Sequence, residues 1–468
     1  MKQQAAGMIL VVGASVLGAA AIAVWLSGGE AADLGERLPG QTVRLPGADA
    51  DADREPANPG MLVNGPGKPS ALKGSWPGFR GPKRDGIAHD ATGLLRAWPP
   101  AGPAVLWRVP VGEGHAGVAI HNGRVYLVDY DRTKREDAIR CLSLDDGQEI
   151  WRYTYSVHIK RNHGMSRTVP AVTDDYLVAI GPKGHVTCLK SQSGVLVWKK
   201  NLPKENKTIV PDWYAGQCPL IEGDLCILAP GGDPLMMGVE LASGDLRWST
   251  PNPGRLGMTH VSVMPVAPPG GVRQYVYCAT RGVVGVAADD GRLLWAFPDW
   301  WIAIANIPSP VPLGDGRVLL TGGYNSGAVA LGLTGGGTAV EEVARFKPAD
   351  LGSDQQTPIR YRDHVYVVLP SGQLACLDQQ LRTVWTSGPN RRFGLGPYLA
   401  ADGMLFVLND DAGTLHLVLA DPSAYRELAS AKVLDGHHAW APMALAAGRL
   451  ILRDSEELRC LQVAEGEE

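Results

Sequence analysis

Short apolar runs separated by turn residues recur through most of the chain. The runs at 124–128, 364–368 and 404–408 are rich in Val, Tyr and Leu, and the pairs Asn-Gly, Arg-Asp and Asp-Gly precede them in that order. Turn pairs next to β-branched and aromatic runs predict antiparallel hairpins. We therefore predict an all-β chain built from short strands.

A longer pattern repeats with a period in the forties. A turn glycine is followed four positions later by a tryptophan in four places, and successive tryptophans are 47, 50 and 47 residues apart. These pairs are Gly147 with Trp151, Gly194 with Trp198, Gly244 with Trp248, and Gly291 with Trp295. Trp385 is the next comparable residue, and we expect Phe346 to take the place of tryptophan in the repeat between. Such a period, with several strands in each repeat, is typical of β-propeller blades.

Cysteines mark one strand of the repeat. A Cys-Leu pair lies on the third strand of four repeats, at Cys141, Cys188, Cys376 and Cys460. Because these positions are equivalent in different blades, we expect small core residues rather than disulfide partners. Cys218 and Cys226 flank a turn, so a bond across that hairpin stays open.

The count of blades follows from the first strand of each repeat, which a proline precedes in most cases. Eight such strands are present, but the last repeat, from Pro442 onward, has only three strands. Residues 104–109 form a tryptophan strand with no blade before it. Pairing the two would close the ring and leave short, protected edges. We therefore predict an eight-bladed β-propeller of four-stranded antiparallel blades over residues 75–468.

These features resemble a known family. The Gly-x-x-x-Trp blade ending and the segment Ser-Trp-Pro-Gly-Phe-Arg-Gly-Pro-Lys-Arg-Asp-Gly at 75–86 resemble the pyrroloquinoline-quinone-like β-propeller repeat proteins of bacterial envelopes. The resemblance covers roughly residues 75–463. It implies the fold and leaves the function open, because this propeller serves both quinoprotein alcohol dehydrogenases and non-catalytic outer-membrane assembly factors of the BamB type.

The motifs that the resemblance implies for a dehydrogenase are not found in the sequence. Quinoprotein alcohol dehydrogenases typically carry a vicinal Cys-Cys disulfide, a calcium ion and a catalytic Asp, whereas this chain has seven cysteines, no Cys-Cys pair and no Cys-x-x-Cys-His haem motif. We therefore expect a monomeric, non-catalytic binding or assembly module for envelope protein or glycan ligands, with no cofactor and no metal site. The alternative is a dehydrogenase that uses pyrroloquinoline quinone and calcium.

The N-terminal part of the chain indicates the compartment. Lys2 precedes residues 7–26, a stretch without charge that is long enough to cross a bilayer as a helix. We predict a membrane anchor within residues 1–30, with the propeller on the periplasmic side, while small residues at 21–23 leave signal cleavage and secretion open. Residues 31–74, rich in Pro, Gly and Asp, predict a flexible linker.

Candidate ligand-binding residues lie in the connections from the last strand of one blade to the first strand of the next. In a propeller these connections surround one mouth of the central channel. Cations and aromatic rings at such a mouth favour an anionic or extended ligand, such as a peptide or a glycan. The candidates are His115, His163, Arg167, Trp213, Tyr214, His260, Trp300, Trp301, Arg391, Arg392, His437, His438 and Trp440.

Composition narrows the class of partner. The chain has 44 Lys and Arg against 48 Asp and Glu, so it carries no basic excess to neutralise a phosphate backbone. Nucleic acid is therefore not an expected partner. The 13 tryptophans against 5 phenylalanines are mostly explained by the repeat, because six of them lie on predicted outer strands.

Overall fold

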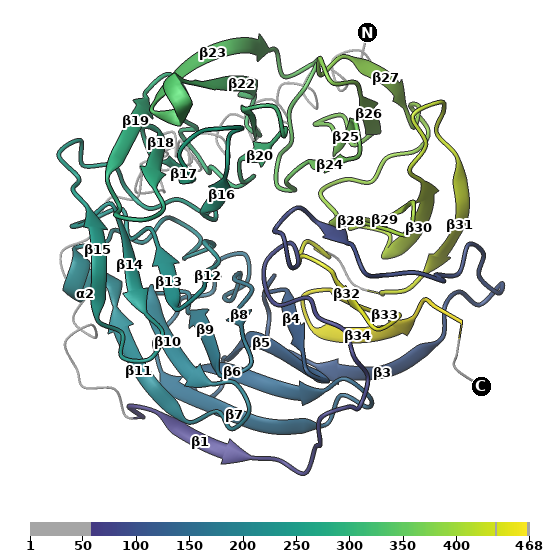
Figure 1. Cartoon of the computed structure of the whole chain (residues 1–468). Coiled ribbons are helices and arrows are strands. Elements are labelled where there is room, and N and C mark those ends of the chain that lie inside the picture. Colours follow the sequence, from purple (N-terminus) through teal and green to yellow (C-terminus); the bar gives the residue numbers. More distant parts are fainter. Residues whose placement is uncertain (1–57, 436–437, 466–468) are drawn as a thin grey trace, which may run out of the picture. The chain divides into compact units, whose positions relative to one another are not determined.

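The computed structural model describes residues 58–435 and 438–465, and these residues form eight sheets arranged in a ring (Figure 1). Each sheet contains four antiparallel strands that run in order from the channel outward, which confirms the predicted eight-bladed all-β propeller. The short helical segments of the described residues are α2 (Leu202–Asn206) and η1 (Gly335–Gly337).

Each blade uses consecutive strands, from the innermost to the outermost. Blade 1 contains β4 (Val118–His121), β5 (Arg124–Asp131), β6 (Glu136–Ser143) and β7 (Glu149–Ser156), and blade 2 contains β8 (Ala171–Val172), β9 (Tyr176–Ile180), β10 (His185–Lys190) and β11 (Leu196–Asn201). Blade 3 contains β12 (Leu220–Glu222), β13 (Leu225–Leu228), β14 (Met236–Glu240) and β15 (Leu246–Thr250), and blade 4 contains β16 (Met264–Val266), β17 (Gln274–Ala279), β18 (Gly282–Ala287) and β19 (Leu293–Phe297). Blades 5 to 7 contain β20 (Val311–Pro312), β21 (Arg317–Gly322), β22 (Gly327–Thr334), β23 (Ala339–Phe346); β24 (Ile359–Tyr361), β25 (His364–Val368), β26 (Leu374–Leu377), β27 (Thr383–Thr386); and β28 (Tyr398–Ala401), β29 (Met404–Asn409), β30 (Thr414–Leu419), β31 (Glu427–Lys432).

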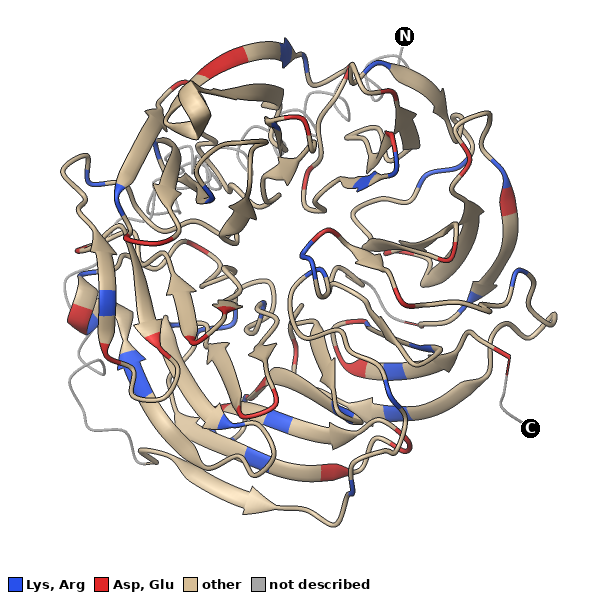
Figure 2. Cartoon of the chain, viewed as in Figure 1, with Lys and Arg blue, Asp and Glu red and all other residues tan. Residues whose placement is uncertain are grey.

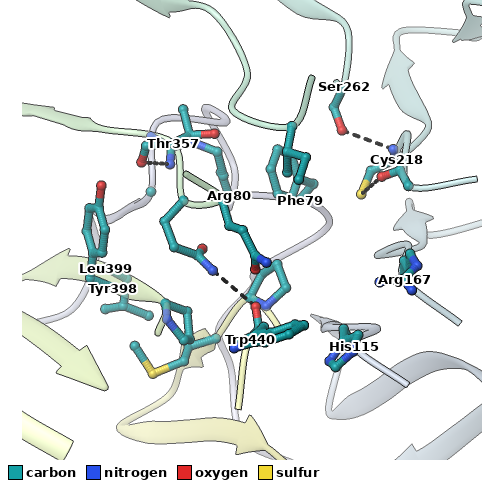
Figure 3. Close-up of a pocket in the computed structure, with 18 of the residues that line it drawn as sticks. Phe79, Arg80, His115, Arg167, Cys218, Ser262, Thr357, Tyr398, Leu399 and Trp440 are labelled. Carbon is teal, nitrogen blue, oxygen red and sulfur yellow. Dashed lines mark hydrogen bonds between the residues drawn. The ribbon is translucent and has the colours of Figure 1, made fainter. Parts of the chain in front are cut away.

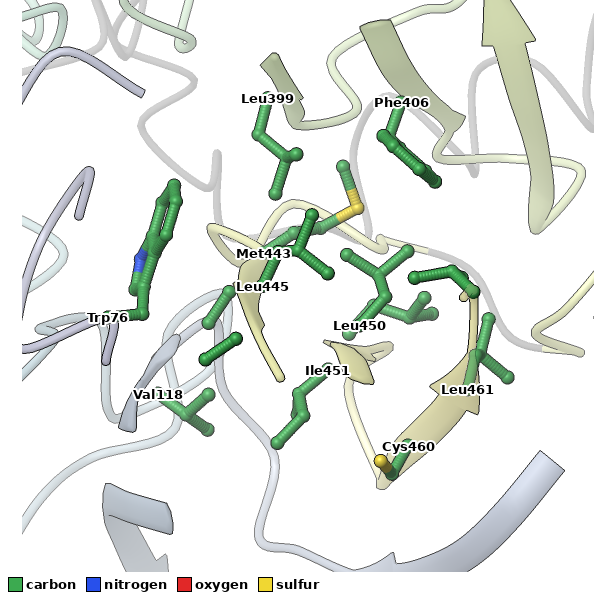
Figure 4. Close-up of a cluster of buried hydrophobic side chains, with 14 of the residues drawn as sticks. Trp76, Val118, Leu399, Phe406, Met443, Leu445, Leu450, Ile451, Cys460 and Leu461 are labelled. Carbon is green, nitrogen blue, oxygen red and sulfur yellow. The ribbon is translucent and has the colours of Figure 1, made fainter. Parts of the chain in front are cut away.

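Blade 8 closes the ring with strands from distant parts of the chain. Its inner strands are β32 (Ala444–Ala446), β33 (Arg449–Arg453) and β34 (Glu457–Gln462), and its outer strand is β3 (Val105–Pro110). Trp107 of β3 is in register with Cys460 of β34, as the closure predicted from the sequence requires. Hydrophobic side chains fill this seam, where Figure 4 shows Trp76 and Val118 beside the strands of blade 8.

Neighbouring blades are joined by tryptophan rings that lie on glycines. In four places the indole of one blade comes closer than 3.0 Å to the point where a Cβ atom would stand on the turn glycine of the next blade. The pairs are Trp107 with Gly147, Trp151 with Gly194, Trp198 with Gly244, and Trp248 with Gly291. Each of these glycines also has a positive φ. The repeated glycine thus receives the ring of the preceding blade, and the tryptophan four residues later packs on the following one.

Indole N–H groups add a polar link at three blade junctions. Each donates a hydrogen bond to a backbone carbonyl that follows the third strand of the next blade. The links are Trp107 to Leu144 at 3.0 Å, Trp198 to Leu241 at 2.9 Å, and Trp385 to Asp421 at 2.9 Å. Each indole therefore contributes a buried apolar ring and a satisfied donor at the same junction.

The cysteines face the tryptophans across the third and fourth strands. Four pairs are in register, namely Cys141 with Trp151, Cys188 with Trp198, Cys376 with Trp385, and Cys460 with Trp107. All seven cysteines are buried and free, so Cys218 and Cys226 are not bonded to each other.

In blade 5, Ala344 occupies the position that tryptophan takes in other blades. It pairs with Ala330, next to a bulge at Val343. The prediction that Phe346 takes this position is wrong, because Phe346 lies two residues further along β23.

The segment before the propeller differs in part from the expected linker. Residues 61–64 form β1 (Met61–Asn64), which adds a fifth strand to the outer edge of β7. An unpaired strand edge offers its backbone groups to any extended segment, and the short apolar run Met61-Leu62-Val63 pairs with it. Residues 65–74 of the predicted linker also follow blade 1, where Gly65 and Ser70 donate to the carbonyls of Ile150 and Gly123. Residues 31–57 of the predicted linker and the predicted anchor, 1–30, lie outside the described residues. Within residues 58–435 and 438–465, no helix is long and apolar enough to cross a membrane.

The contact between indole and glycine predicts unequal costs for two alanine substitutions. Gly244 and Gly403 both have a φ of 77°, but a Cβ on Gly244 would lie 2.7 Å from the ring of Trp198, whereas nothing lies within 4 Å of one on Gly403. Gly403→Ala should cost about 1 kcal/mol for the left-handed backbone. Gly244→Ala should cost about 1–3 kcal/mol more because of overpacking.

Thermal unfolding of the two variants and of the wild type measures this difference. Gly403→Ala is the control for backbone strain alone. An equal loss of thermal stability in both variants would show that the indole does not constrain the junction.

Candidate functional site

The eight connections from an outer strand to the next inner strand converge on the channel. Each of them contributes to one cavity with a volume of about 130 Å³, and residues 76–86 supply the rest of its wall (Figure 3). The contributing residues, one from each connection in chain order, are His115, Arg167, Cys218, His260, Ile307, Thr357, Pro397 and Trp440. The cavity therefore belongs to the whole ring and not to one blade.

Residues 75–88, which we name the plug loop, close the channel under this cavity. The loop enters next to the turn between β4 and β5, where Trp76 and Ile120 exchange two backbone hydrogen bonds of 2.8 Å. It returns as β2 (Ile87–Ala88), which pairs in parallel with β28. Because the loop passes from blade 1 to blade 7 through the channel, the cavity has a floor on one side and the connections around it on the other.

Arg80 fixes the tip of the plug loop. Its Nε donates to the carbonyl of Arg84 at 3.1 Å, and its Nη1 donates to that of Thr357 at 2.8 Å. Its Nη2 donates to the carbonyls of Asp85 and Pro358, both at 2.8 Å. Burial lowers the pKa of Arg80 to about 10, so the side chain stays cationic at neutral pH. Hydrogen bonds from a charged donor are stronger than neutral ones, and here they tie the loop to blade 6.

Side chains link the connections to one another around the mouth. In four consecutive links, a backbone N–H in one blade donates to a side chain at the equivalent position of the next. The links are Val169 to Cys218 Sγ (3.2 Å), Cys218 to Ser262 Oγ (3.0 Å), Ser262 to Ser309 Oγ (3.2 Å) and Ser309 to Thr357 Oγ1 (2.9 Å). We name Cys218, Ser262, Ser309 and Thr357 the side-chain belt. The belt holds the connections of blades 2 to 6 at a common level.

Arg167 is held in place by carbonyl groups. Its Nη2 donates to the carbonyls of His163 at 2.6 Å and Asn162 at 3.2 Å. Its Nε donates to the carbonyl of Trp213. Burial lowers the pKa of Arg167 to about 10, so it is also cationic at neutral pH. Two connections are thus joined through one guanidinium group at the wall of the cavity.

The two histidines of the cavity are neutral at physiological pH. Burial and, next, the charge of Arg167 lower the pKa of His115 to about 3 and that of His260 to about 4. Neutral His115 donates through Nε2 to the carbonyl of His163 at 3.1 Å and lies 4.7 Å from the ring of Trp440. Arg80 and Arg167 therefore supply the positive charge of the cavity.

The structure separates the thirteen candidates into groups. Four of them line the cavity, namely His115, Arg167, His260 and Trp440. Two offer backbone carbonyls to Arg167, namely His163 and Trp213. Tyr214 donates to the carbonyl of Lys160, His438 lies edge-on to Trp440 at 4.6 Å, and His437 lies outside the described residues.

The remaining candidates do not line the cavity. Trp300 is buried in the core between blades, whereas its neighbour Trp301 is exposed. Arg391 lies over the ring of Tyr425 at 5.6 Å, and Arg392 donates to the carbonyl of Pro389 at 3.3 Å. Figure 2 shows cationic and anionic residues interspersed around the ring, so these arginines are not part of a larger basic face.

Sequence reasoning missed the floor and the belt. Trp76 and Arg80 belong to the segment that carries the family resemblance. The structure shows that both line the cavity. The belt had a signal in the sequence, because Cys218, Ser309 and Thr357 each stand directly before the proline that leads a first strand. A small polar residue at that repeated position could have indicated a shared hydrogen-bonding role.

The lining of the cavity does not fit a calcium-assisted quinone site. Calcium takes oxygen ligands, which are usually carboxylates, and no Asp or Glu lines this cavity. The guanidinium groups of Arg80 and Arg167 would also repel a divalent cation. In the described part of the chain, no group of three or more His, Cys, Asp or Glu residues is placed to hold a metal ion.

A family model described as outer membrane protein assembly factor BamB matches residues 135–381. No curated protein matches the chain. Among solved structures, BamB from Moraxella catarrhalis superposes with a TM-score of 0.54 at 13% identity, over 77% of this chain and 99% of that one.

Two dehydrogenases share the same architecture. A quinohemoprotein alcohol dehydrogenase from Comamonas testosteroni matches with a TM-score of 0.56 at 11% identity, over 84% of this chain and 81% of that one. A europium-containing methanol dehydrogenase matches with a TM-score of 0.55 at 11% identity, over 83% and 89%. At such identities these likenesses show the fold alone.

The low pKa values of the cavity histidines predict that the NMR signals of their rings do not shift with pH in the physiological range. Between pH 8 and pH 5.5, the ring carbon-bound proton shifts of His115 and His260 should stay nearly constant, because half-protonation is reached only near pH 3 for His115 and near pH 4 for His260. The variants His115→Gln and His260→Gln assign the signals, and free histidine in the sample reports the pH. A midpoint above pH 5.5 for either ring would contradict the burial described above.

Proposed function

The chain belongs to the BamB-like family of β-propeller repeat proteins, and from this premise we propose that it is a non-catalytic cell-envelope module that binds a segment of a partner protein at the channel mouth. The observation that carries the proposal is the cavity, to which all eight connections contribute and which the plug loop closes from below. A ligand at the mouth would contact every blade at once. An assembly factor, as the family is described, acts on other proteins.

Exposed apolar side chains on the mouth side support a protein ligand. Ile209, Trp301 and Tyr324 lie in connections or loops at this end of the blades and are 73%, 56% and 49% exposed. Large apolar and aromatic side chains at the surface are typical anchors of protein interfaces. A glycan is the other ligand class that the sequence suggested, and its capture in place of a protein would contradict this proposal.

The location in the envelope is part of the same proposal. The family description names an outer membrane protein assembly factor, and residues 7–26 have the length and composition of a membrane-spanning signal anchor. We propose that this segment tethers the propeller to the plasma membrane on its periplasmic side. Secretion after signal cleavage is the alternative.

Replacing anchors at the mouth should reduce the capture of a partner. Trp301→Ala, and separately the double variant Arg391→Ala/Arg392→Ala, should each lower the yield of a cross-linked protein partner from intact envelopes about tenfold, as expected for truncated interface anchors. Quantitative mass spectrometry of the captured protein measures the yield.

Leu246→Ala is the matched control for this experiment. Leu246 is 57% exposed, close to the value for Trp301, but it lies on the outer strand β15. Capture that falls equally in the control, or that is unchanged in all variants, would place the partner elsewhere than the mouth.

Protease accessibility tests the location. The full chain should resist added protease in intact cells and become sensitive once the outer envelope is permeabilised, while remaining with the membrane fraction because the anchor is uncut. Deleting residues 7–26 should leave the chain in the cytoplasm. Protection that persists after permeabilisation of the outer envelope would contradict the periplasmic location, and release as a soluble chain would contradict the anchor.

A further inference from the structure

The cavity carries positive charge that no salt bridge to a carboxylate neutralises within the described residues. Arg80 and Arg167 are its charged lining residues, and within the described residues neither forms an ion pair with Asp or Glu. A cation removed from water without a counter-ion is unfavourable unless other groups compensate it. The backbone carbonyls around each guanidinium do so in part, and an anionic ligand would complete the compensation.

The nearest acidic side chains are engaged elsewhere. The carboxylate of Asp85, beside Arg80, accepts a hydrogen bond from the backbone of Ile87 at 3.1 Å and lies 2.7 Å from the ring nitrogen of His89. The carboxylate of Asp410 accepts from the indole of Trp440 at 2.6 Å, behind the cavity wall. Neither forms a salt bridge with Arg80 or Arg167, although the charge of Asp85 acts on Arg80 from a distance. Arg167 is therefore the cation with less compensation from carboxylates.

Arg167 is positioned to receive an anion. Its Nε and Nη2 are bound by carbonyls of two connections, and its Nη1 makes no hydrogen bond with any described residue. Figure 3 shows Arg167 next to His115 on one side of the cavity. A guanidinium held in this way has little freedom left to lose when a ligand binds, which favours affinity.

The belt adds neutral donors to the same cavity. Ser262 and Thr357 line it, and their oxygens already accept backbone N–H groups at 3.0 and 2.9 Å. The hydroxyl hydrogen of Thr357 has no acceptor among residues 58–435 and 438–465, whereas the hydroxyl of Ser262 also lies within hydrogen-bonding reach of the Cys218 thiol. A hydroxyl both accepts and donates, so each of these is ready to donate to a ligand. Cys218, at the equivalent position, offers only a weak thiol donor.

The size of the cavity limits what enters it. At about 130 Å³ it is smaller than the roughly 300–1,000 Å³ of sites that enclose a whole cofactor or drug-sized ligand. It has room for one end group, and the rest of a longer ligand would lie across the mouth, where Trp301 and Tyr324 are exposed. Donors and positive charge select an end group that only accepts hydrogen bonds and carries negative charge.

We propose that the cavity binds the carboxylate of an extended peptide segment, with Arg167, Ser262 and Thr357 as donors. This inference rests on the proposed function, because it names the chemical group by which the partner segment enters the mouth. Both a C-terminal carboxylate and an acidic side chain supply this group.

Synthetic peptides test the chemistry on the purified full chain in detergent solution. The probes are acetyl-trialanine with a free carboxylate, the same peptide as its amide, an amidated peptide with a central glutamate, and inorganic phosphate. Ligand-observed NMR titration measures each affinity. The free acid or the glutamate peptide should bind about tenfold more tightly than the neutral amide, as expected for hydrogen bonds to a charged group. Whichever of the two binds more tightly identifies the source of the carboxylate.

The belt supplies variants that keep the fold. Ser262→Cys retains an acceptor for the backbone of Cys218, as Cys218 itself does for Val169, but exchanges the hydroxyl for a weak donor. It should weaken binding of the acid several-fold, and Cys218→Ser should strengthen it by a similar factor. Arg167→Gln should weaken it about tenfold, whereas Leu246→Ala, on the outer rim, should change nothing.

Three results would overturn the proposal. These are equal affinity for acid and amide peptides, acid binding that neither Arg167→Gln nor Ser262→Cys alters, and phosphate binding that exceeds carboxylate binding and depends on Arg167. Capture of a protein partner without any carboxylate binding would reject this inference and leave the proposed function standing. Carboxylate binding without a captured protein would reject the proposed function and leave the carboxylate site standing.

Discussion

The ring depends on a contact that leaves no room for a side chain. The indole of one blade lies on a left-handed turn glycine of the next, so the distance and the angle between those blades are set by the thickness of an aromatic ring. Because this contact recurs through blades 8, 1, 2, 3 and 4, the inner ends of the blades meet at a common level. The belt links a backbone N–H of one blade to the side chain of the next at two of these junctions, between blades 2 and 3 and between blades 3 and 4, and continues from there to blade 6.

The plug loop changes what the ring can do. An eight-bladed propeller has a channel along its axis, and here residues 75–88 cross it and leave a shallow, one-sided site. The floor stays in place because a buried guanidinium joins carbonyls of the loop to carbonyls of blade 6. The same guanidinium gives the site its charge. Arg80 thus holds the loop across the channel and also adds positive charge to the cavity wall.

The repeat made the ring, its closure and its mouth predictable, because each follows from spacing along the chain. The contacts of Arg80 did not follow from it, since its partner Thr357 lies 277 residues away and no periodicity links the two. The burial of adjacent residues could not be predicted either. Trp300 is buried and Trp301 is exposed, and this difference depends on how the backbone of one connection turns. β1 was not predicted because its apolar run is only three residues long, lies within a segment rich in Pro and Gly, and finds its partner edge in a blade far along the chain.

The seam in blade 8 sets an order of events in the life of the chain. β34 lies far after β3 in the chain, so the ring stays an open arc until β34 has been synthesised. The contacts of the plug loop with blades 6 to 8 also form only after those late blades have been synthesised. Pairing between such distant segments is slow to form. The chain is proposed to cross a membrane before it folds and functions. Late closure of the ring would leave the polypeptide unfolded, and so able to pass through a membrane channel, during transport.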